Sequence, residues 1–256
     1  MAIDSANSRP RAALITGSGR RIGAAIALTL SRADYDVVLH ANASRADAEE
    51  LAAKITRAGR RANVVLADLA DAKAVNGLIP AAAVFGPLSL LVNNASVFEE
   101  DEIESLERGH FDATLAVNLT APLFLAQAFA AQTPAGRDAS IVNIVDQRVL
   151  RPTPKFFSYT LSKSALHMAT TTLAQALAPV RVNAVAPGPV LPSPRQTAAQ
   201  FEAQAASVPL GQGPTPEAIA AAVVYLANAT SVTGVTLPVD GGQHISWRTP
   251  DSDVAE

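Results

Sequence analysis

Residues 16–23 read Thr-Gly-Ser-Gly-Arg-Arg-Ile-Gly, and this turn stands between a short apolar run, Ala12–Thr16, and an Ala-rich segment with helical spacing, Ile22–Ala33. Glycine lets the backbone turn sharply and approach a pyrophosphate, whose charge is favoured at the N-terminus of the helix that follows. Gly23 would also allow that helix to pack closely against the strand. Many Gly-rich turns merely connect elements, so it is the position between a strand and a helix that indicates a dinucleotide site.

Short runs rich in β-branched residues alternate with longer segments of helical spacing along the chain. The short runs are Ala12–Thr16, Val37–His40, Asn63–Ala67, Leu90–Ala95, Ser140–Val145, Arg181–Pro187 and Val235–Asp240. The longer segments include Ile22–Ala33, Ala46–Ala58, Phe111–Gln132 and Tyr159–Leu177. Several runs are apolar almost throughout, as strands covered on both faces should be. The alternation predicts an α/β fold, a Rossmann-like, doubly wound parallel sheet of about seven strands with helices on both faces.

No internal repeat or low-complexity linker interrupts the alternation, so we expect a single domain over residues 1–256. Two regions break the rhythm. Gly188–Gly213 is rich in Pro, Gly and Gln, and we expect it to be a substrate loop with a short helix around Arg195–Ala206, since loops of this length are usually lids or binding segments. The tail, residues 243–256, is polar and charged and is expected to be flexible.

Composition and charge exclude several function classes. The 20 basic and 23 acidic residues are interspersed and sum to a net charge of −3, a balance that favours neither nucleic acid nor a membrane as partner. The absence of cysteine excludes disulfides and thiolate metal sites, and no metal is expected. No stretch approaches the roughly 20 apolar residues of a membrane span, and no long apolar run precedes the first strand. We therefore expect a cytoplasmic protein that acts on a small molecule.

The end of the second predicted strand indicates which nicotinamide cofactor is bound. NAD-dependent enzymes place Asp or Glu there to bind the ribose hydroxyls, whereas no carboxylate precedes Asp47 here. His40, Ser44, Arg45 and Arg20 could instead donate to a 2′-phosphate, which a carboxylate would repel. The sequence therefore favours NADP(H), although Arg45 could equally be the first residue of a solvated helix.

Tyr159 and Lys163 are spaced i and i+4, which places them one above the other on a helix face. Such a pair is common by chance, but this one follows the run Ser140–Val145 and opens a long Ala-rich helix. A phenol has a pKa of about 10, too high for efficient proton transfer near neutrality. We expect the ammonium and the oxidised nicotinamide to lower the pKa of Tyr159, which would then act as acid or base.

Together these motifs resemble the short-chain dehydrogenase/reductase family over almost the whole chain. The matching motifs are the turn 16–23, Asn93-Asn94-Ala95, Asn118, Tyr159 with Lys163, the segment Asn183–Gly188 and Asp240-Gly241-Gly242. The resemblance implies that Asp68-Leu69 contacts the adenine, that Asn118 anchors a proton-relay water and that Lys163 binds the nicotinamide ribose. The cofactor-binding residues expected from the turn, the strand ends and the resemblance are Gly17, Ser18, Arg20, Arg21, Ile22, Gly23, His40, Ser44, Arg45, Asp68, Leu69, Asn94, Ala95, Ser96, Tyr159, Lys163, Pro187 and Gly188.

Asp146 departs from the common pattern of that family, which has a serine thirteen residues before the tyrosine. An ionised carboxylate cannot donate to a ketone oxygen and would repel a developing alkoxide, so ordinary ketone reduction is harder to explain. A carboxyl group can instead bind an amino-pyrimidine edge or deliver a proton to a ring nitrogen. Reduction of a C=N bond needs a hydride on carbon and a proton on nitrogen, and Asp146 with Tyr159 could supply the proton. The alternative is that Asp146 merely caps the segment that follows.

An Asp in this place resembles the pteridine reductase-like branch of the family, and three further residues agree. Arg21 and Ser96 each stand where most members have Gly, and Phe98 resembles the aromatic residue that stacks a pterin against the nicotinamide. Arg21 could reach both the pyrophosphate and the substrate. Taken alone, Phe98 could equally be a buried loop anchor. The substrate-binding residues expected are Ser96, Phe98, Asp146 and Tyr159.

Three functions follow as candidates. The first is NADPH-dependent reduction of a pterin or dihydrofolate-type ring, with catalytic roles for Tyr159, Asp146, Lys163 and Asn118. The second keeps NADP(H) and acts on a ketone, an alcohol or an oxoacyl group. The third is a nucleotide-binding regulator without activity, and the intact Tyr159, Lys163 and Asn118 count against it.

The family resemblance also implies assembly as a homotetramer. The two long predicted helices, Phe111–Gln132 and Tyr159–Leu177, and the C-terminal strand would form the contacts between subunits. Residues His244–Arg248 could reach the site of a neighbouring subunit, as the tail does in pteridine reductases.

Overall fold

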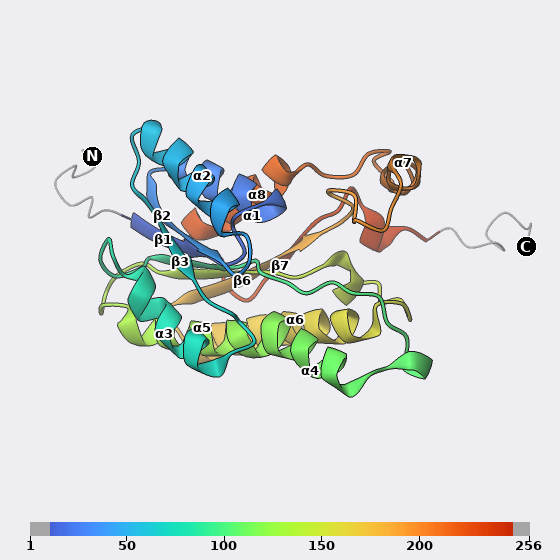
Figure 1. The fold of residues 1–256 in the computed structure, drawn as a ribbon, viewed down its shortest axis with the longest axis horizontal. Helices are drawn as coiled ribbons and strands as arrows, with labels where there is room; N and C mark the ends of the chain where they lie inside the picture. Colours follow the sequence, from blue (N-terminus) through green and yellow to red (C-terminus); the bar gives the residue numbers. More distant parts are fainter. Residues whose placement is uncertain (1–10, 248–256) are drawn as a thin grey trace, which may run out of the picture.

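One sheet of seven parallel strands forms the centre of the protein (Figure 1), whose computed structural model describes residues 11–247. The strand order is β3-β2-β1-β4-β5-β6-β7. The strands are β1 (Arg11–Ile15), β2 (Tyr35–Ala41), β3 (Ala62–Leu66), β4 (Leu90–Asn93), β5 (Ser140–Ile144), β6 (Arg181–Pro187) and β7 (Thr236–Val239). This arrangement confirms the predicted Rossmann-like, doubly wound sheet.

Helices cover both faces of the sheet (Figure 1). On one face lie α1 (Arg21–Arg32), α2 (Arg45–Arg57) and α8 (Pro216–Asn228). On the other face lie α3 (Ala72–Ala82), α4 (Arg108–Leu115), α5 (Ala121–Gln132) and α6 (Phe157–Ala176). The short helix α7 (Ala198–Ala206) stands apart, beyond the ends of the strands. Because helices pack on both faces, every residue of β2, β5 and β6 is buried, which explains the unbroken apolar runs in the sequence.

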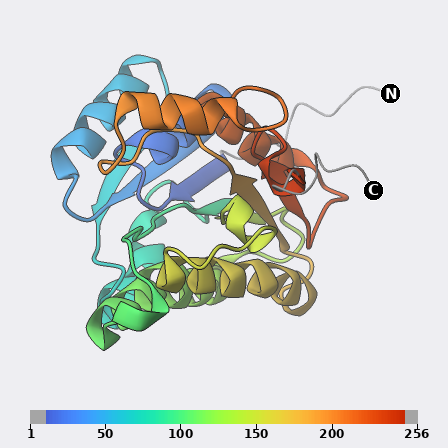
Figure 2. The same cartoon turned by 90° about the vertical axis from the view of Figure 1, so that its right-hand side faces the viewer.

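The chain reverses its direction of travel across the sheet between β1 and β4. From β1 it moves outward to β2 and β3, and then returns to pair β4 with the other side of β1. In sheets of this kind, a crevice opens at the carboxyl ends of the strands where the order reverses, and ligands bind there. Figure 2 looks onto that end of the molecule, with α7 on one side of the strand ends and α6 on the other.

The helix predicted over Phe111–Gln132 is longer than expected and changes its pitch. It begins as α4, passes through one π-helical turn at Ala116–Thr120 and continues as α5. By length and composition, Arg108–Gln132 could cross a membrane. However, α5 packs against β4 and α3, with Leu125 and Phe129 buried in the apolar core. Its apolar character therefore belongs to the packing of the domain.

Two sequence-based boundaries need correction. The loop helix expected around Arg195–Ala206 begins later, because Thr197 and Gln200 form a capping box that fixes the start of α7. The tail expected to be flexible from residue 243 is ordered at its start, where Gln243–Ile245 form a 3₁₀ turn and the N–H of His244 donates to the Asp240 carboxylate at 2.7 Å. Arg248 and the residues after it lie outside the described residues, so the tail's expected reach to a neighbouring subunit stays a prediction.

Candidate active site

The glycine turn after β1 is fixed to the end of β4 and leaves no space for side chains. The Asn94 amide donates to the carbonyl oxygens of Thr16 and Gly17 at 2.9 and 3.0 Å, and the Thr16 hydroxyl accepts from the N–H groups of Asn94 and Ala95. Gly17 has a φ of +62°, and a Cβ there would stand 2.8 Å from the Cα of Ala95. A Cβ on Gly23 would collide with the carbonyl oxygen of Gly17. The turn is thus a rigid backbone cradle at the N-terminus of α1, suited to a phosphate.

Two residues expected to bind the cofactor have a supporting position instead. His40 is buried, its Nδ1 accepts from the N–H of Gly17 at 3.1 Å, and its Nε2 lies 3.1 Å from the carbonyl oxygen of Ala67. Burial lowers the pKa of His40, so the ring is neutral and both nitrogens are engaged. The expectation that His40 donates to a 2′-phosphate is therefore wrong, although the residue does line the pocket. Ser18 is buried and donates to the carbonyl oxygen of His40, which ties the turn to β2.

The remaining predicted phosphate donors differ in their placement. Arg20 is exposed beside the cradle and pairs with Asp47 at 2.8 Å, and the Ser44 hydroxyl lies next to Gly19 at the end of β2. Arg45 is the first residue of α2, exposed and 3.7 Å from Glu49 one turn later, and does not line the pocket. Arg45 therefore matches its alternative interpretation as the start of a solvated helix, which leaves Arg20 and Ser44 as the donors nearest this position.

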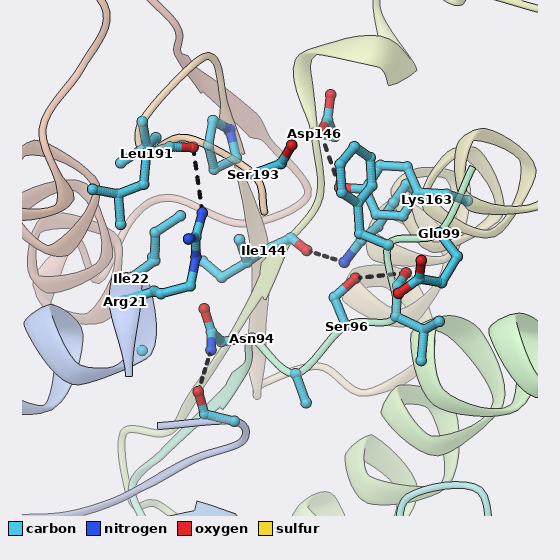
Figure 3. Close-up of a pocket in the computed structure, with 18 of the residues that line it drawn as sticks. Arg21, Ile22, Asn94, Ser96, Glu99, Ile144, Asp146, Lys163, Leu191 and Ser193 are labelled. Atoms are coloured by element: carbon cyan, nitrogen blue, oxygen red, sulfur yellow. Dashed lines mark hydrogen bonds between the residues drawn. The ribbon is translucent and has the colours of Figure 1, made fainter. Parts of the chain in front are cut away.

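A cavity of about 1000 Å³ runs along the carboxyl ends of the strands (Figure 3). Most of the predicted cofactor residues line it, and so do the predicted substrate residues Phe98 and Asp146. Those cofactor residues are Gly17, Arg20, Arg21, Ile22, Gly23, His40, Ser44, Asp68, Leu69, Asn94, Ala95, Ser96, Tyr159, Lys163, Pro187 and Gly188. Ser18, Arg45 and Asn118 are not among the lining residues.

Tyr159 is buried and donates its phenolic hydrogen bond to Oδ2 of Asp146 at 2.9 Å. Burial and the negative charge of Asp146 raise the pKa of Tyr159 well above its usual value. The expected lowering of this pKa rested on the oxidised nicotinamide as well as on Lys163, and for the complex it stays a prediction. In the described residues the shift has the opposite sign, because burial is its largest cause and the charge of Asp146 the next, whereas Nζ of Lys163 lies 5.7 Å from the ring centroid. Tyr159 is held as a neutral phenol, which is a proton donor.

Lys163 lies one helical turn beyond Tyr159, almost completely buried, and its Nζ donates to the carbonyl oxygen of Ile144 at 2.8 Å (Figure 3). Burial lowers the pKa of Lys163 to about 8. The bond to Ile144, at the end of β5, holds the ammonium at the floor of the cavity where α6 crosses the strand. Lys163 is thus charged at neutral pH, and it loses its proton at a lower pH than an exposed lysine would.

Asn118 lies in the π-helical turn and uses its amide to join three parts of the site. Its Oδ1 accepts from the N–H of Val97 at 2.8 Å and from the Ser96 hydroxyl at 3.2 Å. Its Nδ2 donates to the carbonyl oxygen of Val97 at 2.9 Å and to the Ser162 hydroxyl at 3.1 Å. Asn118 therefore fixes the segment after β4 against α6, and its expected part in a proton relay stays a prediction.

Three aromatic rings form one wall of the cavity. The rings of Phe98 and Phe156 are stacked, 4.4 Å apart and 6° from parallel, and Tyr159 meets Phe98 edge to face at 4.7 Å. Phe156 has a φ of +55°, unusual for a bulky residue, directly before α6 begins. Phe98 is thus packed against Tyr159 in the wall of the cavity.

The predicted substrate loop is bound to the cavity by two arginines. Arg21 donates to the carbonyl oxygens of Pro192 and Leu191 at 3.0 and 3.3 Å (Figure 3). Arg195 donates to Glu99 and to the carbonyl oxygen of Phe98, both at 2.7 Å. These bonds hold the loop beside the aromatic wall, and its expected role as a substrate loop stays a prediction.

Sequence reasoning missed three residues that shape this site. Arg148 donates its N–H to Oδ1 of Asp146 at 2.8 Å, and Asp101 accepts from the N–H of Ser158 at the start of α6. Phe156 completes the aromatic wall. In the sequence, only Asp146 pointed to Arg148. The Asp146 side chain caps the 3₁₀ turn Gln147–Val149, and this turn places Arg148 beside the Asp146 carboxylate. The capping alternative for Asp146 is thus real, and the same carboxylate also contacts Tyr159.

A family model described as enoyl-(acyl carrier protein) reductase matches residues 17–244. A short-chain type dehydrogenase/reductase of Picea abies is 32% identical over 249 residues, which cover 91% of this chain and 92% of that one. The chain belongs to the short-chain dehydrogenase/reductase family. It is thus an oxidoreductase, as the sequence led us to expect.

Other members of the family differ in what their names say they act on. FolM alternative dihydrofolate reductase 1 from Brucella canis, solved in complex with NADP, is 45% identical with a TM-score of 0.92, over 96% of this chain and 98% of that chain. 2-Dehydro-3-deoxy-D-gluconate 5-dehydrogenase of Dickeya dadantii is 31% identical over 94% of this chain and 98% of its own length. The first relative is consistent with the pteridine reductase-like branch.

Proposed function

We propose that this protein is an NADPH-dependent reductase of a pterin or dihydrofolate-type ring. The observation that carries the proposal is the direct contact between the Asp146 carboxylate and the neutral phenol of Tyr159. An acceptor and a proton donor side by side fit a ring that presents an N–H group beside a C=N bond. The dihydrofolate reductase from Brucella canis, 45% identical to this chain, supports the same reading.

The residues of the cavity fit NADP(H) better than NAD(H). The Gly17 cradle has no room for a side chain, which suits a backbone-bound pyrophosphate. At the end of β2, where a carboxylate would bind the ribose hydroxyls of NAD, the lining residues are Asn42, Ala43 and Ser44. Arg20 lies beside them and supplies a positive charge for a 2′-phosphate.

The chain's own residues would handle binding and the proton. When bound, the reduced nicotinamide supplies the hydride to a ring carbon. Tyr159 turns its hydroxyl from Asp146 to the adjacent ring nitrogen and gives up its proton, so the C=N bond becomes CH–NH. The positive charge of Lys163 stabilises the phenolate left behind, and solvent returns the proton to it. Asp146 accepts from an N–H group of the ring and Phe98 provides a face for stacking.

Reduction of a ketone or oxoacyl group is the second candidate, and the sugar-acid dehydrogenase of Dickeya dadantii favours it. Tyr159 could protonate an alkoxide equally well. However, Oδ2 of Asp146 lies 2.9 Å from the Tyr159 hydroxyl, so a growing negative charge on a substrate oxygen would face a carboxylate. Because of this repulsion, we rank reduction of a ketone below reduction of a pterin-type ring.

The assembly and the location of the protein are part of the same proposal. Large apolar side chains are exposed on α5 and α6, among them Phe124 and Met168, where a second subunit would cover them. We infer a homotetramer through these helices and a cytoplasmic location, where NADPH is the reductant.

The test is a comparison of substrates and cofactors with the purified protein. NADPH oxidation would be followed with dihydrobiopterin, with dihydrofolate and with a panel of ketones, and each assay repeated with NADH. We expect turnover of at least one dihydropterin, with a kcat/KM for NADPH well above that for NADH. Turnover of ketones alone would overturn the proposed substrate and leave the family unaffected.

A further inference from the structure

Arg148 lines the cavity beside Asp146 and has a donor without a partner in the part of the chain that the structure describes. Its side chain is only 19% exposed, and its closest charged contact joins Nη1 to Oδ2 of Asp146 at 3.5 Å. The Nε–H is buried and has no partner among the described residues. Arg195 also lies beside the aromatic wall, but its guanidinium donates hydrogen bonds to Glu99 and to the carbonyl oxygen of Phe98.

The aromatic rings engage the face of the Arg148 guanidinium and not its N–H groups. Its guanidinium carbon lies 5.6 Å from the centroid of Phe98 and 5.2 Å from that of Phe156. A cation–π contact of this kind uses the flat face of the guanidinium. The N–H donors, which point outward in the plane of the guanidinium, are therefore available for a ligand.

Asp146 and Arg148 together form an acceptor beside a donor. Three donors approach the Asp146 carboxylate. They are the backbone N–H of Arg148 at 2.8 Å, the Tyr159 hydroxyl at 2.9 Å and the guanidinium of Arg148. A carboxylate surrounded by donors accepts hydrogen bonds and gives none. Any further polar group that binds here must therefore offer an N–H to Asp146 and an oxygen to Arg148.

We propose that Arg148 is a specificity-determining residue that selects substrates with a ring carbonyl next to a ring N–H. This inference rests on the proposed function and deepens it. A 2-amino-4-oxo pteridine presents its N–H groups and its carbonyl oxygen along one edge, which matches Asp146 followed by Arg148. A 2,4-diamino ring presents an amino group in place of the carbonyl, so donor would face donor. The geometry points to preference for 4-oxo over 4-amino rings.

The experiment compares binding of two ligands that differ at that atom. Dissociation constants for 7,8-dihydropterin and for 2,4-diaminopteridine would be measured by fluorescence titration in the presence of NADP⁺, for the wild type, Arg148→Met and Arg148→Lys. We expect the wild type to prefer the 4-oxo ring. Arg148→Met should weaken 4-oxo binding by about 10- to 100-fold, as loss of a hydrogen bond to a charged group does, and leave the diamino ligand unchanged or tighter. Arg148→Lys restores a donor and should recover most of the preference.

Several results would overturn the inference. Equal weakening of both ligands by Arg148→Met would mean that Arg148 only supports Asp146. A wild type that binds the diamino ring more tightly would contradict the proposal without any variant. A wild type that binds neither ring would contradict the proposed function. If the wild type turns over dihydropterins and Arg148→Met keeps the same preference as the wild type, only the role of Arg148 is contradicted. Unchanged NADP⁺ affinity in each variant shows that the fold is intact.

Discussion

At the scale of single residues, the protonation of Tyr159 depends on its burial and on the group that it faces. Its hydroxyl contacts Asp146, and burial and that carboxylate both raise its pKa, so the neutral phenol is favoured over the phenolate. A protonated tyrosine can give a proton to a substrate but cannot take one. Tyr159 is therefore in the form that donates a proton, which is the form that reduction needs.

Lys163 offers a test of the electrostatics of the site through stability. Its pKa is about 8 in the folded chain against 10.5 for a free lysine, so between these values the unfolded chain binds more protons and stability rises with pH. We expect the free energy of unfolding of the wild type, measured against Lys163→Met, to rise by ~2 kcal/mol between about pH 8 and 10. Urea unfolding at a series of pH values measures it. Lys54→Met removes an exposed lysine as a control, and a Lys163→Met curve parallel to the wild type would show that burial does not affect this charge.

Local motifs pointed to the residues that we propose take part in the reaction, but not to their partners. Tyr159, Lys163 and Asp146 stand at fixed spacings, and all three line the cavity. Arg148 and Phe156 had no such spacing to mark them, because their roles arise from where a 3₁₀ turn and a left-handed residue direct the chain. The direction in which the described residues shift the pKa of Tyr159 was unreadable for the same reason, since it depends on burial and on the contact with Asp146.

At the scale of elements, the turn before α1 depends on the absence of a side chain at Gly23. We expect Gly23→Ala to weaken NADPH binding by at least about tenfold and to destabilise the fold, because its Cβ would stand 2.6 Å from Nδ2 of Asn94, the amide that holds the turn. Gly77→Ala is the matched control, since Gly77 also lies in a helix and a Cβ there meets nothing within 4 Å. It should stabilise the protein by roughly 0.5–1 kcal/mol. Binding titrations and thermal unfolding measure both, and equal behaviour of the two variants would contradict the cradle.

The start of α6 is held by a residue far away in the sequence. Asp101 is buried and accepts from the N–H of Ser158 at 3.1 Å and from its hydroxyl. We expect Asp101→Ala to cost about 1–2 kcal/mol of stability, as loss of a helix cap does, and to lower kcat, because Tyr159 follows in the same turn. Asp71→Ala removes the exposed cap of α3 as a control and should lower stability but not kcat. Denaturant unfolding and steady-state kinetics separate the two, and an unchanged kcat in Asp101→Ala would show that this cap does not position Tyr159.

The strand pattern was readable from sequence because burial on both faces leaves an unbroken apolar run. The helix Arg108–Gln132 was only partly readable, since the π-helical turn at Ala116–Thr120 depends on the contacts of Asn118 with Ser96, Val97 and Ser162. These contacts join residues more than twenty positions apart. A local pattern cannot contain them.

At the scale of the whole molecule, the exposed apolar residues of α5 and α6 predict assembly. Leu161 and Met168 are two turns apart on α6, and 44% and 64% of their surface is exposed. We expect size-exclusion chromatography with light scattering to give the mass of four chains for the wild type and a smaller species for Met168→Asp. Val84→Asp, an equally exposed apolar residue outside these helices, is the control and should remain tetrameric. A monomeric wild type would refute the assembly.

The central claim is that Asp146 makes this site a reductase of an N–H-bearing ring and not of a ketone. The most direct measurement is NADPH oxidation by the wild type and by Asp146→Ser, each with a dihydropterin and with a ketone panel. We expect Asp146→Ser to lose at least about 100-fold in kcat/KM for the dihydropterin, to turn over ketones equally well or faster, and to keep its affinity for NADPH. A variant that reduces the dihydropterin as well as the wild type does would contradict it.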